Sequence, residues 1–346
     1  MYLTGNQRLA ILLEGGIRGT YGKTGLSLLR YSQAPIVAVI DSECAGLSLP
    51  GLTGIAREVP IVATVAAALA YAPEVLAIGI APSGGVLPHE SLQEVRQAVA
   101  AGLSIVNGLH TPIATLPEFE LQPGQWIWDV RREPPNLPIA SAKARSLLCR
   151  RVLTVGTDMG VGKMSTSLEL NWAAKRRGLR SKFLATGQAG LMLEGDGVAL
   201  DAVRVDFAAG AVEQIVMDFG NDYDILHIEG QGSLLHPGST ATLPLLRGSQ
   251  PTQLVLVHRA RQATIRNHPH VPIPPLGEVV RLYETVAGAV GALLPSSVVA
   301  IALNTAHLDN TDAQQEVEQT EAVTGLPCTD PVRFGAEVLL DAIMQK

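Results

Sequence analysis

The residues best placed to do chemistry lie in one glycine-rich stretch, Gly156-Thr-Asp-Met-Gly-Val-Gly-Lys163. An apolar run precedes this stretch and a helical pattern follows it, so the glycines can turn several backbone N–H groups toward one phosphate. The positive end of the following helix and the ammonium group of Lys163 add to that attraction. We therefore predict a phosphate-binding loop, or P-loop, that holds a nucleotide or a nucleotide-containing cofactor.

The loop departs from the common G-x4-G-K-[ST] spacing in two ways. Five residues separate Gly156 from Gly162, and Met164 stands where a hydroxyl group usually binds Mg²⁺. Ser165 and Thr166 follow, but each residue of a helix turns about 100° further round, which argues against their reaching the same metal. The sequence thus predicts a phosphate cradle without metal ligands, formed by Gly156, Thr157, Asp158, Gly160, Val161, Gly162, Lys163, Met164 and Ser165.

Two polar side chains follow other predicted strands. Glu229 ends the apolar run 225–228, at the edge of the sheet where open α/β proteins bind ligands. We predict that Glu229 is the catalytic residue, a general base; the open alternatives are a metal ligand and a carboxylate that caps a helix or forms an ion pair. Asn304 follows the last predicted strand, where it would bind the base of the cofactor's nucleotide or form a simple turn.

A second glycine-rich turn, residues 13–24, follows the first predicted strand, and Asp41 ends the second strand. This layout resembles a dinucleotide-binding turn, but the full G-x-G-x-x-G pattern is absent. Lys23 and Thr24 would bind an anion at the start of the next helix or stand exposed on that helix. Another turn, Pro82-Ser-Gly-Gly85, follows the third predicted strand at the same edge of the sheet.

The elements that must position these residues alternate along the chain as strand and helix. Apolar runs bounded by turn residues are typical of buried parallel strands, so we predict an α/β fold with two doubly wound domains. Strands are expected over 9–13, 36–40, 75–80, 103–106, 152–155, 182–185, 225–228, 253–257 and 298–303. Helices are expected over 22–31, 64–70, 91–101, 163–177, 208–218, 276–293 and 333–344.

The predicted domain boundaries follow from a proline-rich stretch. Six prolines lie from Pro112 to Pro138, and prolines at this density block helices and central strands. We therefore predict a Rossmann-like domain over 1–110, an interdomain connector over 111–150 and a P-loop NTPase-like domain over 151–346.

The composition narrows the class of protein. A net charge of −6 provides no basic field for a nucleic-acid or anionic-membrane partner. Three widely separated cysteines form no disulfide framework, which fits a reducing, cytoplasmic location. The most apolar segment, 61–81, is interrupted by Pro73 and Glu74, so we expect no membrane span. Several apolar helices could pack in a subunit interface, and we expect a homo-oligomer.

These motifs resemble those of known proteins. The stretch 156–163 resembles the loop of dethiobiotin synthetases, and Ile228-Glu-Gly-Gln-Gly232 resembles their Glu-Gly motif. More of the chain resembles the DgcN-like family, which joins an N-terminal Rossmann-like domain to a C-terminal P-loop domain. The matching stretches are 129–132, 156–164, 185–190, 201–213 and 229–233, whereas the N-terminal domain matches by its layout.

The resemblance implies N-acetylation of a D-amino acid such as D-glutamate by acetyl-CoA, in D-amino-acid catabolism. In that case the P-loop holds the pyrophosphate of CoA without cleaving it, and Glu229 takes a proton from the substrate amine. Lys23, Arg131 and Arg132 would pair with the substrate's carboxylates. The alternatives are an ATP- and Mg²⁺-dependent ligase or kinase, as in dethiobiotin synthetase, and a non-enzymatic nucleotide-binding protein.

Overall fold

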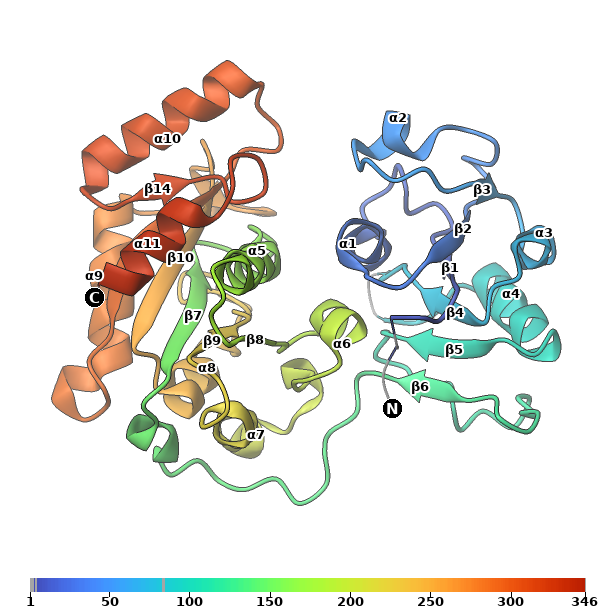
Figure 1. Cartoon of the computed structure of the whole chain (residues 1–346), viewed down its shortest axis with the longest axis horizontal. Helices are drawn as coiled ribbons and strands as arrows, with labels where there is room; N and C mark the ends of the chain where they lie inside the picture. The colour runs from blue at the N-terminus through green and yellow to red at the C-terminus, as the bar shows by residue number, and fades with distance from the viewer. Residues whose placement is uncertain (1–2, 4, 83–84, 346) are drawn as a thin grey trace. The chain divides into compact units, whose positions relative to one another are not determined.

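The chain folds into two compact α/β units (Figure 1). In this computed structural model the described residues are 3, 5–82 and 85–345. The first unit holds residues 1–132 and 188–195, and the second holds residues 133–187 and 196–346. The turn expected at 82–85 includes Ser83 and Gly84, which lie outside the described residues.

The first unit is built on a six-stranded parallel sheet with the strand order β3-β2-β1-β4-β5-β6. Strands β1 and β4 in its centre are buried along their whole length, which explains why they are continuous apolar runs. The strands are β1 (Leu9–Leu12), β2 (Ile36–Ile40), β3 (Ile61–Val62), β4 (Val75–Ile78), β5 (Ser104–Asn107) and β6 (Ile127–Asp129). The helices are α1 (Lys23–Tyr31), α2 (Leu49–Thr53), α3 (Val65–Ala68), α4 (His89–Ala100) and α6 (Gln188–Glu194).

The proline-rich segment differs from the expected connector. Its residues 127–129 form β6, which pairs with β5 at the edge of the sheet, where prolines are tolerated. The Asp129 carboxylate accepts hydrogen bonds from the backbone N–H groups of Ile113 and Ala114, each at 3.0 Å. It also accepts one from the side-chain amide of Asn107 at 2.8 Å. Through these contacts the first unit extends to Arg132.

The second unit has a six-stranded parallel sheet with the order β14-β13-β10-β7-β9-β8, and a separate two-stranded hairpin. The sheet strands are β7 (Arg150–Gly156), β8 (Ser181–Leu184), β9 (Ile225–Ile228), β10 (Gln253–Arg259), β13 (Ser297–Asn304) and β14 (Cys328–Thr329). The hairpin strands are β11 (Thr264–Ile265) and β12 (His268–Pro272). The helices are α5 (Lys163–Arg176), α7 (Val205–Phe219), α8 (Thr242–Ser249), α9 (Leu276–Gly288), α10 (Asn310–Thr324) and α11 (Glu337–Gln345).

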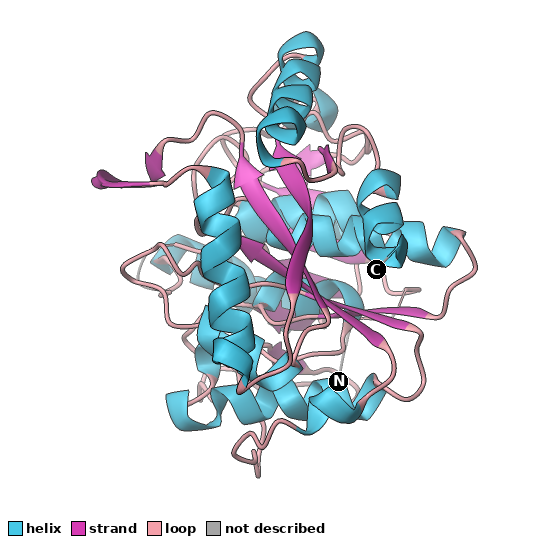
Figure 2. Ribbon diagram, turned by 90° about the vertical axis from the view of Figure 1, so that its left-hand side faces the viewer, coloured by secondary structure: helices cyan, strands magenta, loops and turns pink. Residues whose placement is uncertain are grey.

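Helices cover both faces of this second sheet, as the cyan and magenta ribbons of Figure 2 show. Successive residues of β7 enter different hydrophobic clusters: Val152 packs with α5 and α11, and Leu153 packs with α7, α8 and α9. A strand covered on both faces needs apolar side chains at every position, which is why apolar runs predict such strands. The predicted strands are present in both units, close to their expected bounds. The predicted α/β class is confirmed.

Helix α10 is the longest element that the sequence pattern did not predict. It is largely polar and buries only Ala313 and Val317, so it has no broad apolar stripe. Only the two capping residues at its ends could have indicated a helix from the sequence. Asp309 caps the first turn by accepting from the N–H of Asp312 at 2.8 Å, and Gly325, with φ 69°, ends the helix.

The apolar segment 61–81 divides into β3, α3, a short 3₁₀ turn and β4, because Pro73 and Glu74 break it as predicted. Over residues 3, 5–82 and 85–345, we find no helix with the length and apolar character that a membrane crossing requires.

His227 is a buried polar residue within this fold. It lies in β9 between Val152 of β7 and Phe183 of β8, and neither ring nitrogen has a hydrogen-bond partner in the described part of the chain. Burial lowers the pKa of His227 to about 3 from its ordinary 6.5, because the charged ring would lose its hydration. The positive charge of Lys175 adds to this lowering.

We predict that His227 makes the protein less stable in acid. Below pH 6.5 the unfolded chain binds a proton that the folded protein accepts only near pH 3, so the free energy of unfolding falls between these values. From pH 7 to pH 5 the loss from this residue is about 2 kcal/mol. His227→Leu should remove it in urea unfolding at both pH values, whereas His307→Leu, at an exposed position, should not. An equal loss in His227→Leu and wild type would contradict this.

Candidate functional site

The P-loop follows β7 at the carboxyl edge of the second sheet. Strand, turn and helix succeed one another as predicted, and α5 begins at Lys163. Gly160, with φ 70°, and Gly162, with φ 118°, adopt left-handed conformations that strongly favour glycine. At Gly156 a Cβ atom would lie 3.0 Å from the Lys163 Nζ atom, so the absence of a side chain there lets the lysine fold over the loop.

Lys163 closes the loop from the helix side. Its ammonium group is buried and donates a hydrogen bond to the Asp158 carbonyl oxygen at 2.8 Å. Its stem passes beside Gly230, where an added Cβ atom would lie 2.9 Å from the Lys163 Cδ atom. The same Cβ atom would lie 1.8 Å from the carbonyl oxygen of Thr154. The segment after β9 therefore lies directly on the P-loop, and only glycine fits at position 230.

Asp158 ties the P-loop to the β11–β12 hairpin. Its carboxylate accepts hydrogen bonds from the Gln262 side chain and from the backbone N–H of Arg266, both at 2.7 Å. It also accepts from the N–H of Met159 at 2.6 Å. Asp158 lies in the loop as expected, but its carboxylate is used to shape that loop.

Asn304 and Thr157 also brace the loop. The Asn304 side-chain amide donates to the Val161 carbonyl oxygen at 3.0 Å, and its oxygen accepts from the N–H of Ala306 at 3.2 Å. The Thr157 hydroxyl and the Nδ1 atom of His258 are 2.9 Å apart. Burial lowers the pKa of His258 to about 4, so its ring is neutral near pH 7. Asn304 thus braces the loop, and its expected contact with a nucleotide base stays a prediction.

Glu229 stands at the end of β9 and is almost fully buried. Its Oε2 atom accepts from the backbone N–H groups of Thr186 at 2.9 Å and Gly187 at 3.1 Å, and its Oε1 atom accepts from the Gln231 side chain at 3.0 Å. The Thr186 hydroxyl donates to the Glu229 carbonyl oxygen at 2.7 Å. This residue therefore holds the end of β8 beside the segment that packs on the P-loop.

Sequence patterns did not indicate Tyr283, a fully buried residue of α9. Its hydroxyl donates to the Gly156 carbonyl oxygen at 2.7 Å and accepts from the N–H of Leu234 at 3.1 Å. Burial raises the pKa of this hydroxyl, so it stays a neutral donor. A buried tyrosine usually needs a hydrogen-bond partner for its hydroxyl. This general rule was the only indication from the sequence that Tyr283 bonds to another segment.

The residues expected to bind substrate carboxylates all belong to the first unit. Lys23 is exposed at the start of α1. Arg131 is hydrogen-bonded to His110, and Arg132 forms an ion pair with Asp129 at 3.0 Å. The P-loop, Glu229 and Asn304 belong to the second unit, where the structure brings them together.

The second glycine-rich turn differs from a dinucleotide-binding turn. A Cβ atom at Gly22 would lie 2.1 Å from the Gly16 carbonyl oxygen, so the turn is folded on itself. The fully buried carboxylate of Asp41 accepts from the N–H groups of Ile17 at 3.3 Å and Glu43 at 3.2 Å. This acid holds the turn, whereas the dinucleotide pattern uses it to bind a ribose.

We predict that Gly230→Ala disrupts the site, because the new methyl group would overlap the Thr154 carbonyl oxygen. Forcing the two segments apart should lower the free energy of unfolding by about 1–3 kcal/mol. The matched control is Gly277→Ala in the first turn of α9, where an added Cβ atom meets nothing within 4 Å. Urea unfolding of both variants checks this prediction; equal stability would show that the contact at position 230 relaxes freely.

Two family models match the chain. One, described as a domain of unknown function (DUF1611_C) P-loop domain, matches residues 138–340. The other, described as a domain of unknown function (DUF1611_N) Rossmann-like domain, matches residues 42–133. They place the same two fold types in the same order as the sequence motifs predicted.

Three relatives agree with these models. The chain is 37% identical over 284 residues to a D-glutamate N-acetyltransferase of Tritonibacter scottomollicae, covering 81% of this chain and 84% of that protein. A protein of the same name from a Pseudoalteromonas species is 36% identical over 268 residues, covering 76% of this chain and 79% of that protein. The crystal structure of a DUF1611 family protein from Anabaena variabilis is 71% identical, with a TM-score of 0.96 over 99% of this chain and 100% of that one. The chain therefore belongs to the DUF1611 family, with an N-terminal Rossmann-like domain and a C-terminal P-loop domain.

Proposed function

We propose that this protein is an N-acetyltransferase that moves the acetyl group of acetyl-CoA to the amine of a D-amino acid such as D-glutamate. The observation that carries the proposal is the name shared by two relatives, D-glutamate N-acetyltransferase, at 36–37% identity. The match covers 84% of the first relative, so it includes most of the chain that performs the reaction there.

The P-loop suits a cofactor that is held and not cleaved. The glycine turn, the first turn of the 14-residue helix α5 and the Lys163 ammonium group provide the donors that a pyrophosphate needs. Met164 occupies the position of the usual metal-binding hydroxyl, and the Asp158 carboxylate already accepts three hydrogen bonds. These features favour CoA, whose diphosphate needs charge neutralisation but no bond cleavage.

Acetyl-CoA supplies an activated carbonyl carbon as a thioester. In the transfer, the substrate nitrogen forms a bond to that carbon, the bond from carbon to sulfur breaks, and the thiolate leaves. The nitrogen must lose a proton, and Glu229 is the proposed base. Backbone donors from Thr186 and Gly187 orient its carboxylate, as a base held for proton transfer requires. Lys23, Arg131 and Arg132 are the proposed partners of the substrate's carboxylates.

The second candidate function is an ATP- and Mg²⁺-dependent ligase or kinase. The observation that favours it is the sequence of β7, glycine turn, Lys163 and α5, which P-loop enzymes also use to bind ATP. In this function Ser165 or Thr166 would have to supply the metal-binding hydroxyl. Thr166 already donates its hydroxyl to the Gly162 carbonyl oxygen at 3.1 Å, which leaves Ser165 as the better placed of the two.

We predict that acetyl-CoA and CoA stabilise the protein against heat, by about 2.7 kcal/mol at 100 times their dissociation constant. Lys163→Ala should abolish most of this effect because the loop loses its only full positive charge. Lys175→Ala, at an exposed position in the last turn of the same helix, is the matched control and should respond as wild type. Stabilisation by ATP only with Mg²⁺, and none by acetyl-CoA, would reverse the order of the two candidates.

We also predict that Glu229→Gln distinguishes a catalytic role of this carboxylate from a purely structural one. The amide oxygen can still accept from Thr186 and Gly187, and the Gln231 amide can turn its own oxygen toward the new NH2 group, so thermal stability should be close to that of wild type. Loss of the base should lower kcat for acetylation of D-glutamate by about 10²–10⁴-fold, measured by release of the CoA thiol. Glu229→Ala should lose both activity and stability. A Gln variant as active as wild type would leave Glu229 with its positioning role alone.

A further inference from the structure

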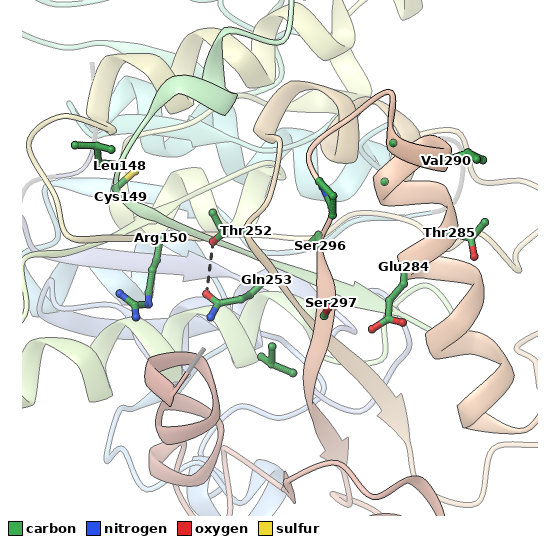
Figure 3. Close-up of a pocket in the computed structure, with 14 residues that line it drawn as sticks. Leu148, Cys149, Arg150, Thr252, Gln253, Glu284, Thr285, Val290, Ser296 and Ser297 are labelled. Carbon is green, nitrogen blue, oxygen red and sulfur yellow. Dashed lines mark hydrogen bonds between the residues drawn. The ribbon is translucent and has the colours of Figure 1, made fainter.

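A pocket of about 830 Å³ lies at the amino edge of the second sheet, the edge opposite the P-loop (Figure 3). Its floor is formed by the first residues of β7, β10 and β13, and one wall by the end of α9 and the residues that follow it. The volume is in the range of pockets that bind small molecules. Its lining includes no residue of the P-loop and none of the proposed catalytic or substrate-binding residues.

A buried hydroxyl group in this pocket lacks a partner. Ser296 is only 7% exposed, and within the described ranges its Oγ atom makes no hydrogen bond. Buried polar groups are hydrogen-bonded in the great majority of cases, and an exception calls for an explanation. A polar ligand in the pocket would supply the missing partner.

The rim of the pocket carries backbone strain. Ala289, with φ 43°, and Val290, with φ 56°, adopt left-handed conformations that a β-branched residue such as valine strongly disfavours. The Val290 side chain is 98% exposed, so packing in a core does not compensate for this strain. Strained residues of this kind cluster at ligand-binding sites.

The pocket holds one charge of each sign, on opposite sides in Figure 3. The Arg150 side chain makes one long hydrogen bond, from Nη2 to the Met344 carbonyl oxygen at 3.4 Å, and no carboxylate pairs with it within the described chain. Glu284 uses one oxygen to accept from the N–H of Val298 at 2.9 Å. The apolar side chain of Leu148 is fully exposed nearby. A ligand that matches this lining carries a carboxylate, an ammonium group and an apolar part.

We propose that this pocket binds a short zwitterionic peptide at a site separate from the P-loop. The carboxylate of the peptide pairs with Arg150, its ammonium group pairs with Glu284, and an amide group between them meets the Ser296 hydroxyl. This binding does not depend on the proposed acetyl transfer, because no residue of the P-loop or of the proposed substrate site takes part in it.

The pocket is connected to the P-loop by two continuous elements. Strand β7 begins at Arg150 and ends at Gly156. In α9, Glu284 lines the pocket, and the preceding residue, Tyr283, donates its hydroxyl proton to the Gly156 carbonyl oxygen. A ligand that draws Glu284 toward it therefore acts on the helix that positions the P-loop, so the zwitterion is a regulator of cofactor binding.

Titration calorimetry with the full chain tests the proposal. The probe is the dipeptide glycyl-leucine, with N-acetylglycyl-leucine and glycyl-leucinamide as analogues that each lack one charge. Glycyl-leucine should bind with a stoichiometry of one. Each single-charge analogue should bind at least about tenfold more weakly, since each lacks one of the two ion pairs.

Substitutions of the pocket residues test where the ligand binds. Arg150→Gln and Glu284→Gln should each weaken the zwitterion at least about tenfold, and the glutamine at 284 can still accept from Val298. The matched control is Glu278→Gln, the same charge change at an exposed position of α9 outside the pocket. Ser296→Ala should weaken binding without lowering the Tm, because it removes a hydroxyl that has no partner in the described structure. No binding of glycyl-leucine, or binding unchanged in Arg150→Gln and Glu284→Gln, would overturn the proposal.

Discussion

The contact between Gly230 and the Thr154 carbonyl oxygen controls the geometry of the carboxyl edge of the second sheet. At this point the backbone after β9 lies against β7 with no space for a side chain. The N–H of Gly230 donates to the Thr154 hydroxyl at 2.9 Å, and that hydroxyl is 3.0 Å from the Ser167 hydroxyl of α5. One threonine thus links the strand before the P-loop, the helix after it and the loop that carries Glu229.

The polar side chains around this contact mostly hold loops. Asp158, Asn304 and Tyr283 each bond a backbone group of the P-loop or of a neighbouring segment. Such bonds keep the loop in a shape suited to a phosphate before any ligand arrives, which reduces the entropy lost on binding. Lys163 and the loop N–H groups are then the proposed contacts of the phosphate. The proposed site is therefore a small set of contacting groups supported by a larger set of positioning groups.

The sequence predicted the parallel strands and the P-loop well because both depend on local patterns. A strand buried on both faces is a continuous apolar run, and a phosphate loop needs glycines and a lysine at close spacing. The partners of polar side chains were less predictable. Asp158 bonds to Arg266, more than 100 residues later, and only the folded sheet order brings these two segments together. Strand β6 and helix α10 were missed for a related reason, since neither has an apolar pattern of its own.

Because of helix α6, no single cut in the sequence separates the two units. The chain leaves the second unit after Gly187, forms α6 in the first unit and returns at Asp196. Within the first unit, Met192 is buried with its Cε atom 2.6 Å from where a Cβ atom of Gly108 would stand, and Gln188 donates to the Thr24 hydroxyl at 3.4 Å. A fragment ending at Arg132 would expose the apolar surface that α6 covers. Modular recombination of this family at a single junction would therefore separate a domain from part of its own core.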